Sequence, residues 1–416
     1  MTTAADVVVV GAGHAGVQLA VTLAKAADPP SVLVLGDEAV LPYERPPLTK
    51  RLLYGEPVPV PLRSADYWER SPVVLRAGER VVAVDPGART VRTEAGEVVG
   101  YGSLVWAAGG RAATCGLPGE ELAGVHTVRD LADLTSLKAS LVGAARAVIV
   151  GGGYIGLEAA AGLRQLGLAV TVLEVAPRLL ARVTGSTVSG FFADLHRSQG
   201  VDVRLGSGVQ QLLGRDGRVV SVQLADGSEL PADVVVVGVG MRPTVGALVD
   251  AGAVGDAAGV LVDAACRTSL ADVYAIGDCA KQANPWSATQ AVMRVESVHN
   301  ASQHAAAVAR ALAGLPVTDP MPPRFWSTQF GRELRTVGLP APGDDEVLRG
   351  DPAGADFSVV YLREGRMAAI DTVDRPRDFA RAQALIAGHW TPPDRDALAQ
   401  ADVDLPRLAP AVGSPG

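Results

Sequence analysis

The first clear pattern along the chain is an unbroken apolar run at residues 7–10, followed by a turn rich in glycine. A continuous apolar run of this length predicts a parallel strand that is buried on both faces. Residues 17–25, which follow the turn, predict a helix. The glycines between the two elements have G-x-G-x-x-G spacing and stand at Gly11, Gly13 and Gly16.

This spacing has a physical cause in each of its positions. Gly11 permits a tight turn, Gly13 lets the backbone approach a pyrophosphate, and Gly16 allows helix and strand to pack closely. Phosphates would then lie against free N–H groups at the positive end of the helix. The alternative is a glycine-rich turn that binds no ligand.

A second apolar strand is predicted at residues 31–35, and two acidic residues follow it closely. An acid at the end of this strand would hold the ribose hydroxyls of a dinucleotide. Asp37 is the candidate, one position later than expected, and Glu38 is the alternative. The loop at 41–50 is rich in proline, which stiffens the backbone and would hold Lys50 in a fixed place. The alternative for Lys50 is a solvated loop lysine.

The decisive observation is an internal repeat. Residues 147–174 repeat the opening unit 140 positions later, with an apolar strand, a helix and a second strand. The glycines of this second copy stand at Gly151, Gly153 and Gly156. A chance strand–helix–strand unit is the alternative to a second dinucleotide site.

The second strand of the repeat ends at Glu174, 18 residues after Gly156, as expected of a ribose-binding acid. A carboxylate at this point accepts hydrogen bonds from both ribose hydroxyls and repels a 2′-phosphate. It therefore favours NADH over NADPH. Arg178 and Arg182 follow closely and could line the adenosine pocket.

The rest of the chain continues the alternation of strands and helices. Ser297 is a plausible N-cap for a helix that runs to residue 312. Leu117-Pro-Gly is interpreted as a linker, and the tail after His389 carries little signal and is expected to be mobile. Further strands are predicted within 73–99, 101–111, 201–222, 233–240 and 268–280, antiparallel strands at 325–327, 333–337 and 357–362, and a helix at 377–387.

Composition excludes several classes of protein. The formal charge of −8 argues against a general nucleic-acid binder, and no apolar run approaches the length of a membrane span. The N-terminus shows no recognisable signal peptide. The small and odd number of widely spaced cysteines fits a reducing cytoplasm, which is the expected location. The three cysteines, at 115, 266 and 279, are too widely spaced for a C-x-x-C pair or a zinc site.

Taken together, these motifs resemble the NADH-dependent ferredoxin reductases that serve cytochrome P450 and Rieske oxygenase systems. The matching stretches include VVVVGAGHAG, GDEAVLPYERPPLTK, VIVGGGYIGLE, VYAIGDCA, RVESVHNA and RFWSTQF, in family order up to about Gly338. The resemblance implies an α/β fold like that of glutathione reductase, with two Rossmann-like domains and a C-terminal α+β domain. It implies an FAD-binding domain at 1–112 and 243–320, an NAD-binding domain at 113–242, and a C-terminal domain at 321–416.

The resemblance also implies the site residues. Lys50 and Glu158 are expected to pair where the nicotinamide enters and Trp326 to cover the flavin, so these three are the predicted catalytic residues. The alternatives are a helix-surface carboxylate for Glu158 and a core aromatic for Trp326. The predicted FAD contacts are Gly11, Gly13, Ala15, Gly16, Asp37, Lys50, Val81, Arg129, Asp278 and Val298. The predicted NAD contacts are Gly151, Gly153, Tyr154, Ile155, Gly156, Glu174 and Arg182.

The reaction implied is hydride transfer from NADH to FAD, followed by release of single electrons to an iron-sulfur ferredoxin. This chemistry belongs to the cofactors, so none of the six histidines is given a role. The protein is expected to be a monomer or a homodimer, to bind neither nucleic acid nor membrane, and to need no metal.

Two alternatives from other classes remain at this point. One is an NADH oxidase, peroxidase or disulfide reductase on the same scaffold, which needs a reactive cysteine beside the flavin. Residues 43–50 occupy that neighbourhood without a cysteine. The other is an NADH-responsive signalling flavoprotein like apoptosis-inducing factor, although the sequence lacks the long insertions and basic surface of that role.

Overall fold

The computed structural model describes residues 3–55, 58–402 and 405, and they form two compact units. The first unit contains residues 3–44, 59–111 and 241–323. The second contains 45–55, 58, 112–240, 324–402 and 405. The C-terminal segment and the short stretch around Lys50 thus belong to the same unit as the second glycine motif. The three predicted domain ranges stay a prediction.

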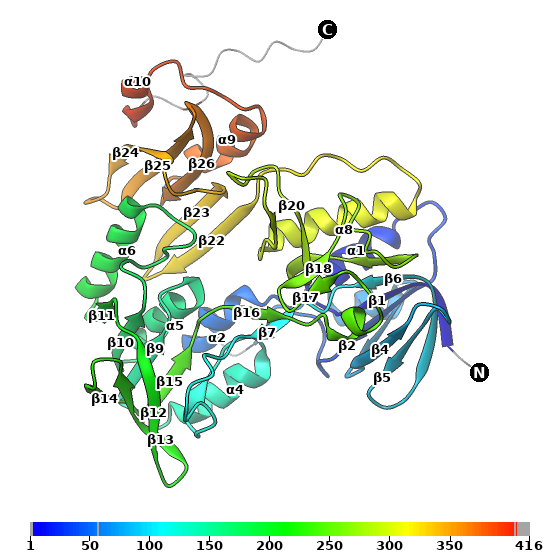
Figure 1. The fold of residues 1–416 in the computed structure, drawn as a ribbon, viewed down its shortest axis with the longest axis horizontal. Helices are drawn as coiled ribbons and strands as arrows, with labels where there is room; N and C mark the ends of the chain where they lie inside the picture. The colour runs from blue at the N-terminus through cyan, green and yellow to red at the C-terminus, as the bar shows by residue number, and fades with distance from the viewer. Residues whose placement is uncertain (1–2, 56–57, 403–404, 406–416) are drawn as a thin grey trace. The chain divides into compact units, whose positions relative to one another are not determined.

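The first unit is built on a seven-stranded sheet in the order β3-β2-β1-β6-β5-β4, with β19 also paired to β6 (Figure 1). Strands β3, β2, β1, β6 and β19 are parallel, and β5 and β4 extend the sheet in antiparallel fashion. The strands are β1 Thr3–Val10, β2 Val32–Gly36, β3 Val73–Ala77, β4 Val81–Asp85, β5 Thr90–Thr93, β6 Val98–Trp106 and β19 Val273–Ala275.

Helices α1 (His14–Leu23) and α8 (Val298–Leu312) pack together on one face of this sheet. The sheet has a hydrophobic core on each face. Val7 and Val9 of β1 pack in the core beneath α1 and α8, and Val8 and Val10 pack in the core on the other face, because successive side chains of a strand point to opposite faces. The other elements of this unit are α3 Ala65–Arg70, β7 Gly110–Ala112, whose last residue lies in the second unit, β16 Met241–Pro243, α7 Gly246–Asp250, β17 Gly255–Asp256, β18 Gly259–Leu261, η2 Gly277–Cys279, β20 Ala280–Ala283 and β21 Val292–Met293.

The second unit repeats the parallel design in a five-stranded sheet of order β11-β10-β9-β15-β8. Its strands are β8 Val125–His126, β9 Arg146–Val150, β10 Ala169–Glu174, β11 Asp202–Leu205 and β15 Val234–Val237. The helices are η1 Pro46–Thr49, α2 Arg51–Tyr54, α4 Leu131–Ser140, α5 Tyr154–Gln165 and α6 Ser186–Ser198. A three-stranded antiparallel sheet contains β12 Val209–Arg215, β13 Arg218–Leu224 and β14 Glu229–Pro231.

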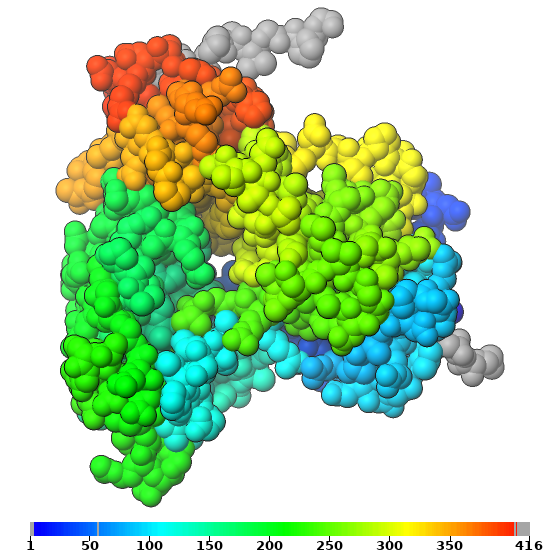
Figure 2. All heavy atoms as spheres, in the orientation of Figure 1, coloured from blue at the N-terminus to red at the C-terminus, as the bar shows by residue number. Residues whose placement is uncertain are grey.

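The C-terminal part of the second unit is an antiparallel sheet of order β22-β23-β26-β25-β24. Its elements are β22 Arg324–Gln329, β23 Arg332–Gly338, β24 Asp345–Asp351, β25 Asp356–Arg363, β26 Arg366–Val373, α9 Pro376–Ala387 and α10 Arg395–Ala399. The green atoms of α6 meet the orange atoms of this sheet in Figure 2. Glu346 of β24 accepts hydrogen bonds there from the first turn of α6, at Ser186 and Thr187.

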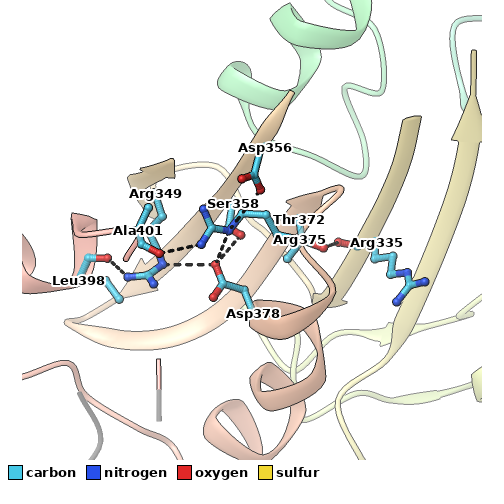
Figure 3. A network of polar contacts seen from close by, with 9 residues as sticks. All are labelled: Arg335, Arg349, Asp356, Ser358, Thr372, Arg375, Asp378, Leu398 and Ala401. Carbon is cyan, nitrogen blue, oxygen red and sulfur yellow. Dashed lines mark hydrogen bonds and ion pairs between the residues drawn. The ribbon is translucent and has the colours of Figure 1, made fainter. Parts of the chain in front are cut away.

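A buried ion pair ties helix α9 to this sheet (Figure 3). The guanidinium of Arg349 is fully buried and lies 3.4 Å from the carboxylate of Asp378 in α9. The same carboxylate oxygen accepts a 2.8 Å hydrogen bond from Ser358 and pairs with Arg375 at 3.2 Å. Arg349 also donates to the carbonyl of Leu398, which fixes α10 to β24.

The structure confirms most predicted elements and corrects three expectations. The first helix begins at His14 rather than residue 17, because Gly13 already serves as its N-cap. Leu117-Pro-Gly is no linker, since it lies within the second unit and Gly119 packs against Leu212. The described part of the predicted tail is packed: Trp390 is buried, and α10 buries Leu398 completely. Residues 403–404 and 406–416 lie outside the described residues.

A buried carboxylate in β26 makes the stability of the second unit depend on pH. Asp371 accepts hydrogen bonds from Thr336 (2.5 Å) and Tyr361 (2.6 Å), and the Tyr361 oxygen in turn accepts one from the backbone N–H of Gly185. Burial raises the pKa of Asp371 from 3.8 to about 7. The folded state therefore keeps this proton where the unfolded state has lost it, and the free energy of unfolding falls as pH rises from about 4 to 7.

We expect Asp371→Asn to remove this contribution. From pH 5 to pH 8 the free energy of unfolding of the wild type should fall by about 2–3 kcal/mol relative to that of the variant, following 1.36 kcal/mol for each unit of pKa shift. Urea unfolding of both proteins at the two pH values measures the difference. If the two proteins differ in free energy of unfolding by the same amount at both pH values, Asp371 is ionised throughout this range.

Candidate functional site

The turn between β1 and α1 has the geometry of an anion cradle. Gly11 has φ of +109°, and a Cβ there would lie 2.3 Å from the carbonyl oxygen of Ala107. A Cβ on Gly16 would lie 2.0 Å from the carbonyl oxygen of Gly11, so helix and strand approach as closely as predicted. A Cβ on Gly13, in contrast, would meet no atom within 4 Å. The space beside Gly13 is open.

The turn between β9 and α5 repeats this geometry almost atom for atom. Gly151 also has φ of +109°, and a Cβ on Gly156 would lie 2.1 Å from the carbonyl oxygen of Gly151. The space beside Gly153 is open, as it is beside Gly13. Both of these glycines are helix N-caps without a side-chain hydrogen bond, so N–H groups of the first turn remain available for an anion. Each turn therefore fits a pyrophosphate.

The acid at the end of β2 is exposed. Among the described residues, none bonds to the carboxylate of Asp37, whereas Glu38 accepts a 2.6 Å hydrogen bond from Tyr43. Asp37 is therefore better placed than Glu38 to receive a ligand hydroxyl.

Glu174 lies directly beside the second glycine turn. Its carboxylate accepts 2.7 Å hydrogen bonds from the backbone N–H groups of Gly152 and Ala176. The two arginines that follow differ sharply. Arg178 is committed to the chain, since its guanidinium bonds the carbonyls of Ala181 and Thr184 and the hydroxyl of Ser189. Arg182 is exposed, and of the two it alone is placed to meet a nucleotide.

The first turn of α5 presents two side chains in opposite ways. Ile155 is 43% exposed, an apolar surface next to the open cradle. The hydroxyl of Tyr154 is buried against the C-terminal sheet beside Thr336 and Asp371, and burial raises its pKa. Because its phenol is buried, Tyr154 can contact a ligand at the glycine turn only through its backbone.

A second group of predicted residues gathers in the first unit. Asp278 lies in η2 beside Gly277, which has φ of +73°. A Cβ on Gly277 would lie 3.1 Å from the Cβ of Ala15 in α1. The backbone N–H of Gly277 donates to Nδ1 of His304, and the carbonyl of Asp278 accepts from Arg294. The N-cap of α8 is Ser297, as predicted, and Val298 is its first residue.

The Glu158 carboxylate is buried in the second unit and holds three donors. Lys50 donates to Oε2 at 2.6 Å and Thr49 to the same oxygen at 2.5 Å. Ser327 of β22 donates to Oε1 at 2.7 Å. Glu158 is only 3% exposed, so it is no helix-surface carboxylate, and Lys50 is no solvated loop lysine. Sequence reasoning expected the pair with Lys50 and missed Thr49 and Ser327.

The remaining predicted residues lie in varied surroundings. Trp326 is 39% exposed on the face of β22 opposite to Ser327, so it is no core aromatic. Arg129 is partly buried, and its backbone N–H donates to Asp133 while its carbonyl accepts from Arg45. Val81 is buried in the core at the start of β4.

The cysteines are poorly suited to redox catalysis. All three are free, and Cys266 and Cys279 are buried. Burial raises the pKa of Cys279 to about 12, and burial together with Glu120 raises the pKa of Cys115 to about 11. A thiol with so high a pKa supplies little thiolate at neutral pH. This weighs against a peroxidase or a disulfide reductase.

Comparison with known proteins identifies the family. Residues 5–305 match the family described as pyridine nucleotide-disulphide oxidoreductase, and residues 324–409 match the one described as reductase C-terminal. A ferredoxin–NAD(P)(+) reductase of a Sphingomonas species is 45% identical over 92% of both chains. The 5,5′-dehydrodivanillate O-demethylase ferredoxin reductase subunit of a Sphingobium species is 45% identical over 98% of this chain and 99% of its own. The chain belongs to the ferredoxin reductases of this family.

Solved structures of ferredoxin reductases share the whole fold. A ferredoxin reductase from Rhodopseudomonas palustris is 35% identical with a TM-score of 0.92, over 97% of this chain and 100% of its own. Putidaredoxin reductase, solved as a covalent complex with putidaredoxin, is 34% identical with a TM-score of 0.91, over 97% of each chain. The predicted oxidoreductase class and the fold of two dinucleotide-binding domains with a C-terminal domain are thereby confirmed.

Among the residues that the structure describes, no helix is both long and apolar enough to cross a bilayer. Within the same residues, no group of three or more metal-ligating side chains is placed to hold an ion.

Proposed function

We propose that this protein oxidises NADH and passes the electrons, one at a time, to an iron-sulfur ferredoxin of a cytochrome P450 or Rieske oxygenase system. The observation that carries the proposal is the pair of open glycine cradles at Gly13 and Gly153, each at the N-terminus of a helix and each followed by an acid. The ferredoxin is proposed because relatives that match nearly the whole chain are named ferredoxin reductases. A cytoplasmic location and a monomeric or homodimeric state remain predictions.

The two cradles take different nucleotides in this proposal. The first turn, with Asp37 and Asp278, binds FAD, and Gly153, Ile155 and Glu174 bind NADH. FAD, when bound, accepts a hydride and releases electrons singly. The protein supplies position and charge. The N-terminus of α8 at Val298 carries partial positive charge that favours an electron-rich ring.

The Lys50–Glu158 pair orients the nicotinamide in this proposal. Lys50 is the exposed end of the pair, with 18% of its side chain accessible, while its ammonium is held by Glu158 and by the carbonyl of Pro46. A fixed ammonium orders a polar substrate group at little entropic cost. Trp326, exposed on the opposite face of β22 from Ser327, covers the flavin in this proposal.

The proposal is tested on the purified protein by its visible spectrum, then by anaerobic titration with NADH and with candidate ferredoxins. We expect flavin absorbance, bleaching by about one equivalent of NADH, and reoxidation by ferredoxin. A folded protein that takes up no flavin would overturn the proposal. Stable reduction by NADH without turnover with any ferredoxin would favour the signalling alternative.

Glu174 should set the preference for NADH. We expect Glu174→Gln to lower kcat/KM for NADH by about tenfold and to raise the NADPH-to-NADH ratio by at least as much, because hydrogen bonds to a charged group contribute about 1.5–3 kcal/mol. Steady-state kinetics with both nucleotides measure this ratio. Asp202→Asn, which removes a half-exposed carboxylate at the start of β11, is the matched control and should change neither value. An unchanged ratio in Glu174→Gln would remove Glu174 from nucleotide recognition.

A further inference from the structure

The Glu158 carboxylate is the end of a longer chain of buried polar groups. Ser327 donates to it, Gln329 Nε2 donates to Ser327 Oγ at 3.0 Å, and Gln329 Oε1 lies 2.9 Å from His196 Nε2. Ser327, Gln329 and His196 are all fully buried. The chain thus runs from α6 through β22 to α5 and opens to solvent only at Lys50.

The chemistry of the groups sets the direction of every hydrogen bond in this chain. A carboxylate only accepts, so Ser327 donates to Glu158 and accepts from the amide nitrogen of Gln329. The amide oxygen of Gln329 then faces His196, which must carry its proton on Nε2. Burial lowers the pKa of His196 to about 4, so the ring is neutral at neutral pH. All the donors point toward Glu158.

We infer that Ser327, Gln329 and His196 are positioning residues that hold the Glu158 carboxylate, and through it the Lys50 ammonium, in place for the nicotinamide. This inference rests on the proposed function. Oε2 is taken by Thr49 and Lys50 and Oε1 by Ser327, so the carboxylate is held from both sides. Without Ser327 the carboxylate is held from one side only, so the position of the Lys50 ammonium is less tightly fixed.

The burial pattern supports a positioning role over ordinary packing. In β22 the side chains alternate, so Ser327 and Gln329 share the face toward Glu158 while Trp326 lies on the other. A buried position of this kind normally holds an apolar side chain, because an unmet polar group costs free energy. Three consecutive polar members, joined end to end, constrain geometry in a way that apolar packing does not.

The test compares Ser327→Ala and Gln329→Leu with Ser358→Ala in the flavin-loaded protein. Ser358 is the matched control: it is fully buried in the same sheet and donates to another carboxylate, Asp378, at 2.8 Å. We expect the first two variants to slow flavin reduction by NADH in stopped flow by about tenfold or more, as misplacement of a positioning group does. Their dissociation constants for NAD⁺, measured by calorimetry, should stay within about twofold, since the dinucleotide cradle is untouched.

Two further measurements separate positioning from loss of structure. Ser327→Thr keeps the hydroxyl and should restore most of the rate. In ¹⁵N spectra of histidine-labelled protein, His196 should show the neutral Nε2–H form, and its signal should change in Gln329→Leu but not in Ser358→Ala.

The outcomes distinguish this inference from the proposed function. If Lys50→Ala slows flavin reduction and Ser327→Ala does not, the inference fails alone. If Lys50→Ala leaves the rate unchanged, the role of the pair in the proposed function fails. An equal slowing in Ser358→Ala would show a structural effect and overturn the inference.

Discussion

Gly13→Asp should give a folded protein without flavin, while Gly153→Asp should keep its flavin and lose its affinity for NADH. Both glycines have ordinary backbone angles, with φ of −82° and −86°, and a Cβ meets nothing within 4 Å at either position. Both are helix N-caps, where aspartate is among the preferred residues. The fold should therefore accept each substitution.

The ligand should not accept it, because each new carboxylate would occupy the space and oppose the charge of a pyrophosphate. Like charges in contact cost several kcal/mol, so we expect at least about a 100-fold loss of affinity at the altered cradle. Flavin content from the visible spectrum and NADH binding by calorimetry measure the two effects. Each variant is the control of the other, since they make the same change in two copies of one turn.

The assignment of FAD to the first cradle and NADH to the second depends on this asymmetry. The reverse result, with flavin lost only in Gly153→Asp, would exchange the two roles. Equal loss of flavin in both variants, with unchanged melting temperatures, would contradict separate nucleotide sites.

Asp378→Ala should be the most destabilising single change in the C-terminal sheet, at about 3–5 kcal/mol. Asp378 is the carboxylate partner of the fully buried Arg349, and it also accepts from Ser358 and pairs with Arg375 (Figure 3). Its removal takes this carboxylate away from the buried guanidinium of Arg349 and from Arg375. Urea unfolding of the whole protein, compared with the wild type, measures the loss.

Asp356→Ala is the matched control for this prediction. Asp356 also faces Arg375, at 3.8 Å, but its side chain is 69% exposed, and such pairs contribute at most about 1 kcal/mol. Replacing both partners, in Arg349→Met with Asp378→Leu, should recover most of the stability because both charges of the buried pair are removed together. A loss in Asp378→Ala no larger than that in Asp356→Ala would show that the buried pair contributes no more than an exposed one.

The local sequence pattern was sufficient to predict an element where one short segment contains every residue that the element requires. The strand, the turn and the helix of each cradle follow one another within about twenty residues. The first and third glycines of each turn stand where a side chain would collide with neighbouring backbone. The cap at Ser297 and the helix at Pro376–Ala387 are local in the same way.

Local pattern failed where burial depends on a distant partner. The residues after His389 are rich in proline and alanine and carry little local signal, yet Trp390 and Leu398 are buried. The carbonyl of Trp390 accepts a hydrogen bond from Met367 of β26, and Leu398 lies on α10, which packs against β24. The polar alternation of Ser327 and Gln329 is visible in the sequence, but it does not say which carboxylate or histidine those side chains meet.

The sequence by itself determined that the chain contains two copies of one nucleotide-binding turn, because the steric demand for glycine and the position of the acid are properties of a single short segment. Only the tertiary structure decided how Lys50, Glu158 and Ser327 form one buried cluster. Lys50 and Glu158 are 108 positions apart in the sequence, and Glu158 and Ser327 are 169 positions apart. Hydrogen bonds between side chains so far apart depend on how the helices and strands pack, and that packing is a property of the whole folded unit.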